Sequence, residues 1–359
     1  MSHVVIVGAG IAGMLSALEL ADRGWQVSLM DAGPDHPPAS WAGGGILSPL
    51  FPWRYPASLL PLTRHARHDY ALWRDRILDA AGVDPELLDG GMVVLADAAG
   101  QQQASDWAAL NGMPVQCGSA ASWFPWLQDS PAVRLPDVAR IRNPRLLQGL
   151  ALLIRQSRIQ WLQGHVEALQ TSSSGVRLQT SAGVLQADHA LVTAGAWSQK
   201  LLPQLTSITY PVKGQMLLYR APEPFPDQVL LAEQGYLIPR SGGLLLAGST
   251  VEPDQWDGRP TEQACKQLQQ TVAQLWPALG KVQPLAQWSG IRPGCRRAVP
   301  IIGPVADSHE RLWVNTGHFR NGLVCGPASA RLVAQLISGQ TPLCDPAPYS
   351  VSSSESSPP

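Results

Sequence analysis

The chain has 359 residues, 45% of them hydrophobic and 15% charged, which is enough for a sizeable core and two domains. Lys and Arg number 26 against 27 Asp and Glu, so the net charge of −1 provides no sequence-wide basic field for nucleic acid or an anionic membrane. The N-terminus lacks a basic region followed by a signal-like apolar run, and no apolar stretch approaches a membrane span. Five cysteines without a C-x-x-C pair predict neither a disulfide framework nor a metal site, and we expect a cytoplasmic protein.

The stretch VVIVGAGIAG begins the chain with a short β-branched run, Val4 to Val7, that predicts a strand buried on both faces. Gly8, Gly10 and Gly13 follow it in the spacing G-x-G-x-x-G. In this spacing the first glycine permits a tight turn, the second admits a pyrophosphate to the backbone, and the third lets the helix pack on the strand. The pattern therefore predicts a dinucleotide site.

The residues after the glycines complete a βαβ unit. A helix is predicted from Ile11 to Arg23, with Gly24 ending it, and a second strand from Val27 to Met30 leads to Asp31. The helix N-terminus offers free N–H groups to phosphates, and Asp31 can accept hydrogen bonds from ribose hydroxyls. An ordinary crossover whose glycines only make a turn is the alternative, and the unit alone does not separate NAD from FAD.

The segment SWAGGGILSPLFPWRYP contains three consecutive glycines, Gly43 to Gly45, between large apolar side chains. Such a run is costly inside a helix or strand, so it indicates backbone pressed against a planar group or a helix start with unusual φ angles. A flexible linker is the alternative, but linkers are not normally flanked by Trp41 and Phe51. A helix from Ser58 to Ala80, ended by Gly82, is predicted next.

The rest of the chain alternates between α/β and mainly β sequence. From Arg142 the α/β pattern returns with Asn143 as a helix cap before Pro144, and TAGAWS repeats the strand–glycine–helix pattern. A last helix is predicted from Pro327 to Ser338. We predict an α/β fold, in which a Rossmann-like dinucleotide domain is interleaved with an α+β substrate domain built on a mainly antiparallel sheet. The predicted ranges are 1–82, 142–208 and 290–346 for the dinucleotide domain, 83–141 and 209–289 for the substrate domain, and 347–359 for a disordered Ser/Pro-rich tail.

Motifs along almost the whole chain resemble one family. The chain resembles the flavin-dependent D-amino acid oxidase/sarcosine oxidase superfamily, and within it the bacterial glycine oxidases of thiazole biosynthesis. The resemblance rests on VVIVGAGIAG with Asp31, SWAGGGILSPL, RNPRLL, TAGAWS, VKGQML, GYLIPR, SGIRPG and GHFRNGL, in the family's order. It implies a Rossmann-like domain with non-covalent FAD, a substrate domain above the flavin, and a role in thiamine thiazole biosynthesis.

The resemblance also implies which residues contact FAD. The glycines and Asp31 hold the pyrophosphate and ribose, Val166 meets the adenine through its backbone, and the segment from His318 to Leu323 faces the flavin's pyrimidine edge. The implied cofactor residues are Gly8, Gly10, Ile11, Ala12, Gly13, Asp31, Ala32, Trp41, Ala42, Gly43, Gly44, Gly45, Val166, Ala194, Gly195, Trp197, His318, Phe319, Arg320, Asn321, Gly322 and Leu323.

Three residues match the family's substrate site. Arg292 in SGIRPG matches the arginine that grips the substrate carboxylate, a group that suits a guanidinium fork. Tyr236 in GYLIPR matches the hydroxyl that completes this clamp, and Arg320 in GHFRNG matches a second position near the substrate. The alternatives are a surface charge after a strand for Arg292 and a loop ion pair for Arg320.

The sequence departs from close relatives directly after SGIRPG. Cys295, Arg296, Arg297 and Ala298 stand where relatives tend to have Pro-Asp or Pro-Glu with Gly. Two extra cations at the flavin edge or tunnel mouth would alter substrate preference. Cys295 raises the question of a thioether to the flavin, but the family cysteine falls nearer Gly290, so we expect FAD to be non-covalent.

The implied reaction is oxidative deamination. Hydride transfer from Cα of glycine, sarcosine or a small D-amino acid to flavin N5 gives an imino acid, which hydrolyses to the keto acid and ammonia. Dioxygen then reoxidises the flavin to form hydrogen peroxide. The alternatives are an amine dehydrogenase that passes electrons to a quinone, an NAD-dependent dehydrogenase, and a flavin-binding scaffold without turnover. A homo-oligomer is a further expectation from the relatives.

Overall fold

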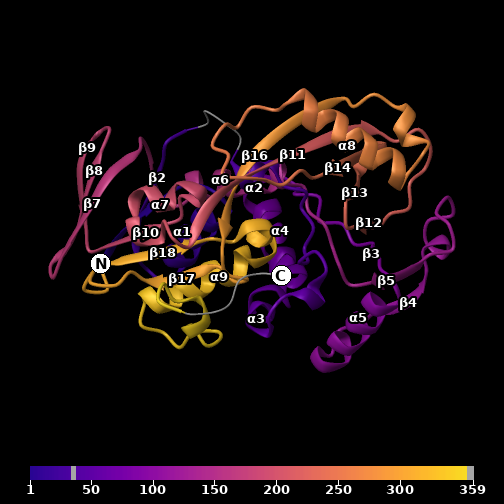
Figure 1. The fold of residues 1–359 in the computed structure, drawn as a ribbon. Helices are drawn as coiled ribbons and strands as arrows, with labels where there is room; N and C mark the ends of the chain where they lie inside the picture. Colours follow the sequence, from indigo (N-terminus) through magenta and orange to yellow (C-terminus); the bar gives the residue numbers. More distant parts are fainter. Residues whose placement is uncertain (34–37, 354–359) are drawn as a thin grey trace.

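The structure is a computed structural model that describes residues 1–33 and 38–353, and its strands form three sheets. Figure 1 shows a mainly parallel sheet with its helices towards the left and a second, mainly antiparallel sheet towards the right. A small sheet, β7 to β9, projects at the left edge of the same view. This arrangement confirms the predicted α/β fold with a Rossmann-like sheet and an antiparallel second sheet.

The Rossmann-like sheet has six strands in the order β17-β18-β10-β1-β2-β6. Strand β1 lies at its centre, parallel to β2 and β10, and only the edge strand β17 runs antiparallel to its neighbour. The strands are β1 (His3–Val7), β2 (Gln26–Asp31), β6 (Gln160–Gln163), β10 (His189–Val192), β17 (Ile301–Pro304) and β18 (Leu312–Thr316). Covered on both faces, β1 has the continuous apolar sequence of a buried parallel strand.

Different layers cover the two faces of this sheet. Val4 and Ile6 pack in a buried cluster with the helices, whereas Val5 and Val7 pack in another cluster with the small sheet. The helical layer comprises α1 (Ile11–Asp22), α4 (Ala66–Ala81), α6 (Asn143–Gln156) and α9 (Gly322–Ile337). The small sheet comprises β7 (Val166–Ser172), β8 (Gly175–Thr180) and β9 (Gly183–Ala187).

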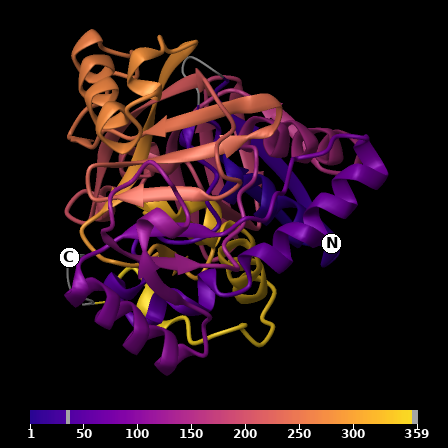
Figure 2. The same cartoon turned by 90° about the vertical axis from the view of Figure 1, so that its right-hand side faces the viewer.

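The second sheet has nine strands in the order β15-β11-β14-β13-β12-β3-β5-β4, with β16 paired to β11. Its strands are β3 (Met92–Leu95), β4 (Gln116–Ser119), β5 (Pro131–Leu135), β11 (Thr209–Arg220), β12 (Val229–Ala232), β13 (Gly235–Arg240), β14 (Leu244–Gly248), β15 (Glu252–Pro253) and β16 (Ala286–Cys295). Helix α8 (Glu262–Leu275) lies over its central strands in both views (Figures 1 and 2), and α5 (Ala98–Asn111) packs near β5.

Three predicted helices differ from those in the structure, two of them in the first half of the chain. The helix predicted from Ser58 to Ala80 is divided into a 3₁₀ turn (Ala57–Leu59), α3 (Leu60–Thr63) and α4, because His65 leaves helical angles with φ −103° and ψ 10°. Asn143 does not cap α6. Its side chain instead donates to the Ser40 carbonyl at 2.7 Å, and Arg142 occupies the cap position.

The last helix, α9, begins at Gly322 rather than at the predicted Pro327. A proline at this position lacks the N–H that would bond to the carbonyl of Leu323, four residues earlier. The hydroxyl of Tyr70 on α4 donates to that carbonyl at 2.7 Å and so satisfies it. The helix therefore continues through Pro327 because a distant tyrosine replaces the missing backbone bond.

The tail predicted to be disordered is ordered over residues 347–353. Tyr349 is 1% exposed within the helical core cluster, and its hydroxyl donates to the Ser58 carbonyl at 2.5 Å. Arg297 donates to the carbonyls of Ser350 and Val351, both at 2.6 Å. The prediction of disorder is therefore wrong for these residues, and 354–359 lie outside the described part of the chain.

The predicted domain boundaries remain predictions, and β16 runs through the boundary proposed at residue 290. No helix within residues 1–33 and 38–353 is long and apolar enough to span a membrane. The same described ranges contain no cluster of three or more His, Cys, Asp or Glu side chains placed to bind a metal ion.

Candidate active site

A cavity of about 1030 Å³ extends between the two large sheets. One end is formed by the turns after β1, β2, β10 and β18, and the other by β13 and β16 of the second sheet. Ligands of open α/β sheets bind at the carboxyl ends of parallel strands. The predicted residues that line this cavity are Gly8, Gly10, Ile11, Ala12, Asp31, Ala32, Trp41, Gly43, Gly44, Gly45, Val166, Ala194, Gly195, Trp197, Tyr236, Arg292, His318, Phe319, Arg320, Gly322 and Leu323.

Three predicted cofactor residues, Gly13, Ala42 and Asn321, lie behind the cavity wall instead of lining it. A Cβ on Gly13 would lie 1.8 Å from the carbonyl oxygen of Gly8, so Gly13 permits α1 to approach the preceding turn. Ala42 accepts a hydrogen bond from the Trp288 indole at 3.0 Å. These residues support the wall, and their direct contact with the cofactor stays a prediction.

The turn after β1 is fixed by backbone geometry and by Asp31. Gly8 has φ +107°, a conformation that L side chains rarely adopt, and its N–H donates to the Met30 carbonyl at 2.8 Å. The Asp31 carboxylate accepts from Ala9 N at 2.8 Å and from Gly33 N at 2.9 Å. An ionised carboxylate has about four acceptor positions, so Asp31 retains capacity for ribose hydroxyls.

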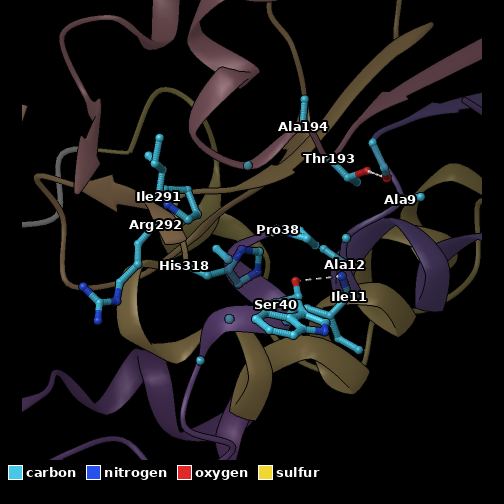
Figure 3. A pocket seen from close by; sticks show the side chains of 18 of the residues that line it. Ala9, Ile11, Ala12, Pro38, Ser40, Thr193, Ala194, Ile291, Arg292 and His318 are labelled. Atoms are coloured by element: carbon cyan, nitrogen blue, oxygen red, sulfur yellow. Dashed lines mark hydrogen bonds between the residues drawn. The ribbon is translucent and has the colours of Figure 1, made fainter. Parts of the chain in front are cut away.

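The N-terminus of α1 opens towards the cavity. Its cap residue is Gly10, which has no side chain to bond the first N–H groups. Ser40 Oγ accepts from Ile11 N at 3.0 Å, a contact visible in Figure 3, and this is the one side-chain bond to the start of α1 among the described residues. A helix start of this kind binds phosphate through its N–H groups and its partial positive charge.

Arg292 extends from β16 into the other end of the cavity. In Figure 3 its guanidinium lies on the far side of His318 from Ser40 and Ile11. Its Nη1 donates to the Thr250 carbonyl at 3.2 Å and its Nη2 to Ser249 Oγ at 2.9 Å. A guanidinium has five N–H donors, so several remain for a ligand.

Arg292 forms no ion pair with a carboxylate within the described residues. Burial lowers the pKa of Arg292 and the charge of Arg320 adds to this shift, while Tyr236 and the charge of Glu252 oppose it. The guanidinium packs directly against the backbone of Gly214 on β11, because a Cβ at that position would lie 2.0 Å from Nη1. A desolvated cation held in this way favours an anionic ligand.

Tyr236 and Arg320 flank the same region. Tyr236 on β13 is 7% exposed, and its hydroxyl donates to Met216 Sδ at 3.4 Å. Arg320 is exposed, and its guanidinium lies 5.6 Å from the Phe319 ring centre. Within the described chain Arg320 forms no ion pair, which argues against the alternative of a loop salt bridge. The structure thus brings all three predicted substrate residues to one cavity.

Three buried polar atoms on cavity residues lack a protein partner in the described structure. They are Asn143 Oδ1, Asn315 Oδ1 and His318 Nε2. Burial lowers the pKa of His318 to about 4, so its imidazole is neutral at pH 7. Buried polar atoms are normally hydrogen-bonded, and a ligand rich in donors and acceptors, such as FAD, fits these orphaned groups.

The residues after SGIRPG do not line the cavity. Cys295 is 2% exposed in a hydrophobic cluster, and burial raises the pKa of its thiol. The guanidinium of Arg296 lies 5.1 Å from the Tyr210 ring centre, while Arg297 binds the C-terminal carbonyls. Neither the expected change in substrate preference nor a flavin link at Cys295 receives support from these positions.

Several lining residues were missed by sequence reasoning. Ser40 and Thr193 are the first residues of SWAGGGILSPL and TAGAWS but were not named as site residues, and Thr193 Oγ1 donates to the Gly8 carbonyl at 2.8 Å (Figure 3). Lys200 and Trp256 lie outside the quoted motifs, and the Lys200 ammonium is 4.5 Å from the centre of the Trp256 ring. The local sequence gives no signal that these two residues line the cavity.

The geometry defines a dinucleotide-binding protein whose ligand extends from α1 towards the second sheet. Residues 3–336 match the family model described as FAD dependent oxidoreductase, and the chain belongs to this family. It is therefore an enzyme that uses FAD. The orphaned polar atoms, the N-terminus of α1 and the glycine strip (residues 43–45) fit this cofactor.

Relatives match almost the entire chain. A glycine oxidase from Pseudomonas aeruginosa is 42% identical over 357 residues, which are 97% of this chain and 98% of the relative. The crystal structure of glycine oxidase from Geobacillus kaustophilus superposes with a TM-score of 0.91 at 28% identity, covering 98% of this chain and 99% of that chain. The bifunctional protein ThiO/ThiG from Nostoc is 29% identical over 355 residues, 93% of this chain and 52% of the relative.

Proposed function

We propose that the protein oxidises glycine or another small amino acid, such as sarcosine or a small D-amino acid, to the keto acid, ammonia and hydrogen peroxide. The observation that carries this proposal is Arg292, a cation without a carboxylate partner in the described structure that projects into the FAD cavity from the second sheet. The names of the relatives from Pseudomonas and Geobacillus support the same substrate class.

Arg292 binds the substrate carboxylate in this proposal. Its remaining N–H donors suit a planar anion, and two parallel charge-assisted bonds fix the orientation of the amino acid. In this proposal the Tyr236 hydroxyl turns its single O–H from Met216 Sδ to the carboxylate and closes one side of the clamp. Arg320 adds positive charge at the exposed rim, which attracts the anionic end of the substrate. Bound FAD supplies the acceptor for two electrons.

Acid–base chemistry by the protein is not needed at the substrate end. Asp31 is the one carboxylate among the described lining residues, and it lies at the nucleotide end. His318 is neutral at pH 7 because burial lowers its pKa to about 4. We therefore assign orientation and charge stabilisation, rather than proton abstraction, to the residues around the substrate.

Further parts of the proposal concern context. We propose that FAD is bound non-covalently and that dioxygen is the second substrate. We also propose that the protein is a cytoplasmic homo-oligomer and that it has a role in thiamine thiazole biosynthesis. The ThiO/ThiG relative supports the last of these through its name. Acid precipitation is expected to release all FAD into the supernatant, whereas a yellow pellet would contradict non-covalent binding.

An oxygen electrode separates the oxidase from an amine dehydrogenase. The purified holoprotein is given glycine, sarcosine or a small D-amino acid, and oxygen and peroxide are measured together. We expect oxygen consumption with equimolar peroxide. Flavin reduction without oxygen consumption would favour a dehydrogenase that uses a quinone. Failure of every amino acid to reduce the flavin anaerobically would contradict the proposal.

A further inference from the structure

In the glycine strip, residues 43–45, the carbonyl groups of Gly44 and Gly45 accept hydrogen bonds from protein donors. The Gly44 carbonyl accepts from Nη2 of Arg240, the last residue of β13. The Gly45 carbonyl accepts from Ile141 N at 2.8 Å. Both glycines line the FAD cavity, so Arg240 lies directly behind a peptide that faces the cofactor site.

The other side of the same peptide carries a free donor. The Gly44–Gly45 peptide is trans, so its N–H and its carbonyl point in opposite directions. Since Arg240 is bonded to the carbonyl oxygen, the Gly45 N–H points away from Arg240. This N–H has no protein acceptor in the described structure. A backbone donor without a protein acceptor that lines a ligand cavity is available to an acceptor of the ligand.

We propose that Arg240 raises the reduction potential of the bound FAD by acting through the Gly44–Gly45 peptide. The cation withdraws electron density at the carbonyl, which makes the Gly45 N–H a stronger donor. Reduced flavin carries more negative charge than oxidised flavin, so a stronger donor and a nearby cation stabilise the reduced form more. Arg240 is thus a positioning residue that contacts the strip and not the cofactor.

The surroundings of Arg240 leave its charge effective. Within the described residues it forms no ion pair, and its Nη1 is buried without a partner. Arg140 and Arg142 add positive charge nearby, and the opposing Glu86 is already bonded to Arg142 at 2.8 Å. Burial, reinforced by Arg140, lowers the pKa of Arg240 to about 9, which keeps the guanidinium charged at pH 7.

A purely structural role is the competing explanation. A Cβ on Gly45 would lie 2.9 Å from Arg240 Nη2 and 2.0 Å from the Ile141 carbonyl, so the strip is tightly seated. A structural role predicts that losing Arg240 weakens FAD binding alone. The electrostatic role predicts that the midpoint potential of the FAD that remains bound also falls. This inference depends only on FAD binding and not on which amine is the substrate.

The test is the midpoint potential of FAD in the holoprotein, measured by dye equilibration, together with the dissociation constant of FAD from the apoprotein. Arg240→Gln removes the charge and keeps a donor, and we expect a tenfold smaller equilibrium constant for reduction, which is ~30 mV. Arg240→Lys should stay within about threefold of the wild type. Arg220→Gln is the matched control, because Arg220 also ends a strand opposite Leu244 but is exposed and bonds to Gly242.

A second variant covers the case in which Arg240→Gln does not retain FAD. Glu86→Gln leaves the contact with Gly44 intact and removes a negative charge that opposes Arg240. We expect reduction to become about threefold more favourable, which is ~15 mV. An unchanged potential in Arg240→Gln or, if that variant is empty, in Glu86→Gln would overturn the proposal. Equal falls in Arg240→Gln and Arg240→Lys would also overturn it.

Discussion

The two ends of the cavity are built in different ways. At the nucleotide end, the turn of Gly8, the start of α1 and Asp31 come from one continuous segment, and backbone N–H groups bond to Asp31 and to the Met30 carbonyl. At the substrate end, Arg292 and Tyr236 stand on strands of another sheet and depend on neighbours that are remote in sequence. Local geometry therefore determines cofactor binding, whereas the pairing of distant strands determines where the substrate anchor lies.

Gly13→Val is expected to have the largest effect, because it destroys the nucleotide end. Its Cβ would lie 1.8 Å from the Gly8 carbonyl, a backbone atom that cannot move aside without opening the turn. We expect protein that contains no FAD, measured as flavin released by acid from purified protein. Gly24→Asn at the other end of α1 is the control, since nothing lies within 4 Å of its Cβ and asparagine tolerates its φ of +82°.

Gly214→Ala is expected to damage the substrate end alone. The new methyl group would displace the Arg292 guanidinium, and a misplacement of about 1 Å costs roughly 100-fold in rate. We expect kcat/KM for glycine to fall about 10- to 100-fold, mainly through KM, while FAD content remains normal. A variant with normal kinetics would show that the anchor is not seated on Gly214. A loss of FAD would show that the two ends are not independent.

His318 lies between the two ends and is expected to give the smallest effect, on stability. The pKa of His318 in the folded protein is about 4, below the usual 6.5, so as the pH falls this imidazole is protonated in the unfolded chain first. The free energy of unfolding therefore keeps its full value above pH 6.5 and decreases as the pH falls towards 4. The expected decrease from His318 is about 2 kcal/mol between pH 7.5 and 5. Urea unfolding of wild type and His318→Gln at both pH values measures this difference. Parallel pH profiles would contradict it.

The sequence predicted the nucleotide end well because its signals are local. The glycine spacing, the strand before it and Asp31 each have a geometric requirement that is visible within thirty residues. Prediction failed where a group remote in sequence changed the local structure. The Tyr70 hydroxyl bonds to the Leu323 carbonyl, which lets α9 continue through Pro327. The Asn143 side chain bonds to the Ser40 carbonyl and therefore does not cap α6.

The same limit applies to the substrate end. Arg292, Tyr236 and Arg320 were predicted from a family resemblance, and the structure brings them to one cavity. The supports of that site were not predicted. Gly214 and Arg240 lie within recognised motifs, but their roles depend on which strand lies beside them and on which backbone they face. Neither relation is encoded by local spacing.

The most direct test of the carboxylate anchor compares two substrates in one variant. Arg292→Ala is assayed with glycine and with a small amine that has no carboxylate, and Arg296→Ala, exposed outside the cavity, serves as control. Losing a charge-assisted bidentate contact costs on the order of 2–4 kcal/mol, or roughly thirty- to a thousandfold in kcat/KM. We predict this loss for glycine, little change for the amine, and normal FAD content. Equal losses for both substrates would contradict the account and make Arg320 the candidate anchor.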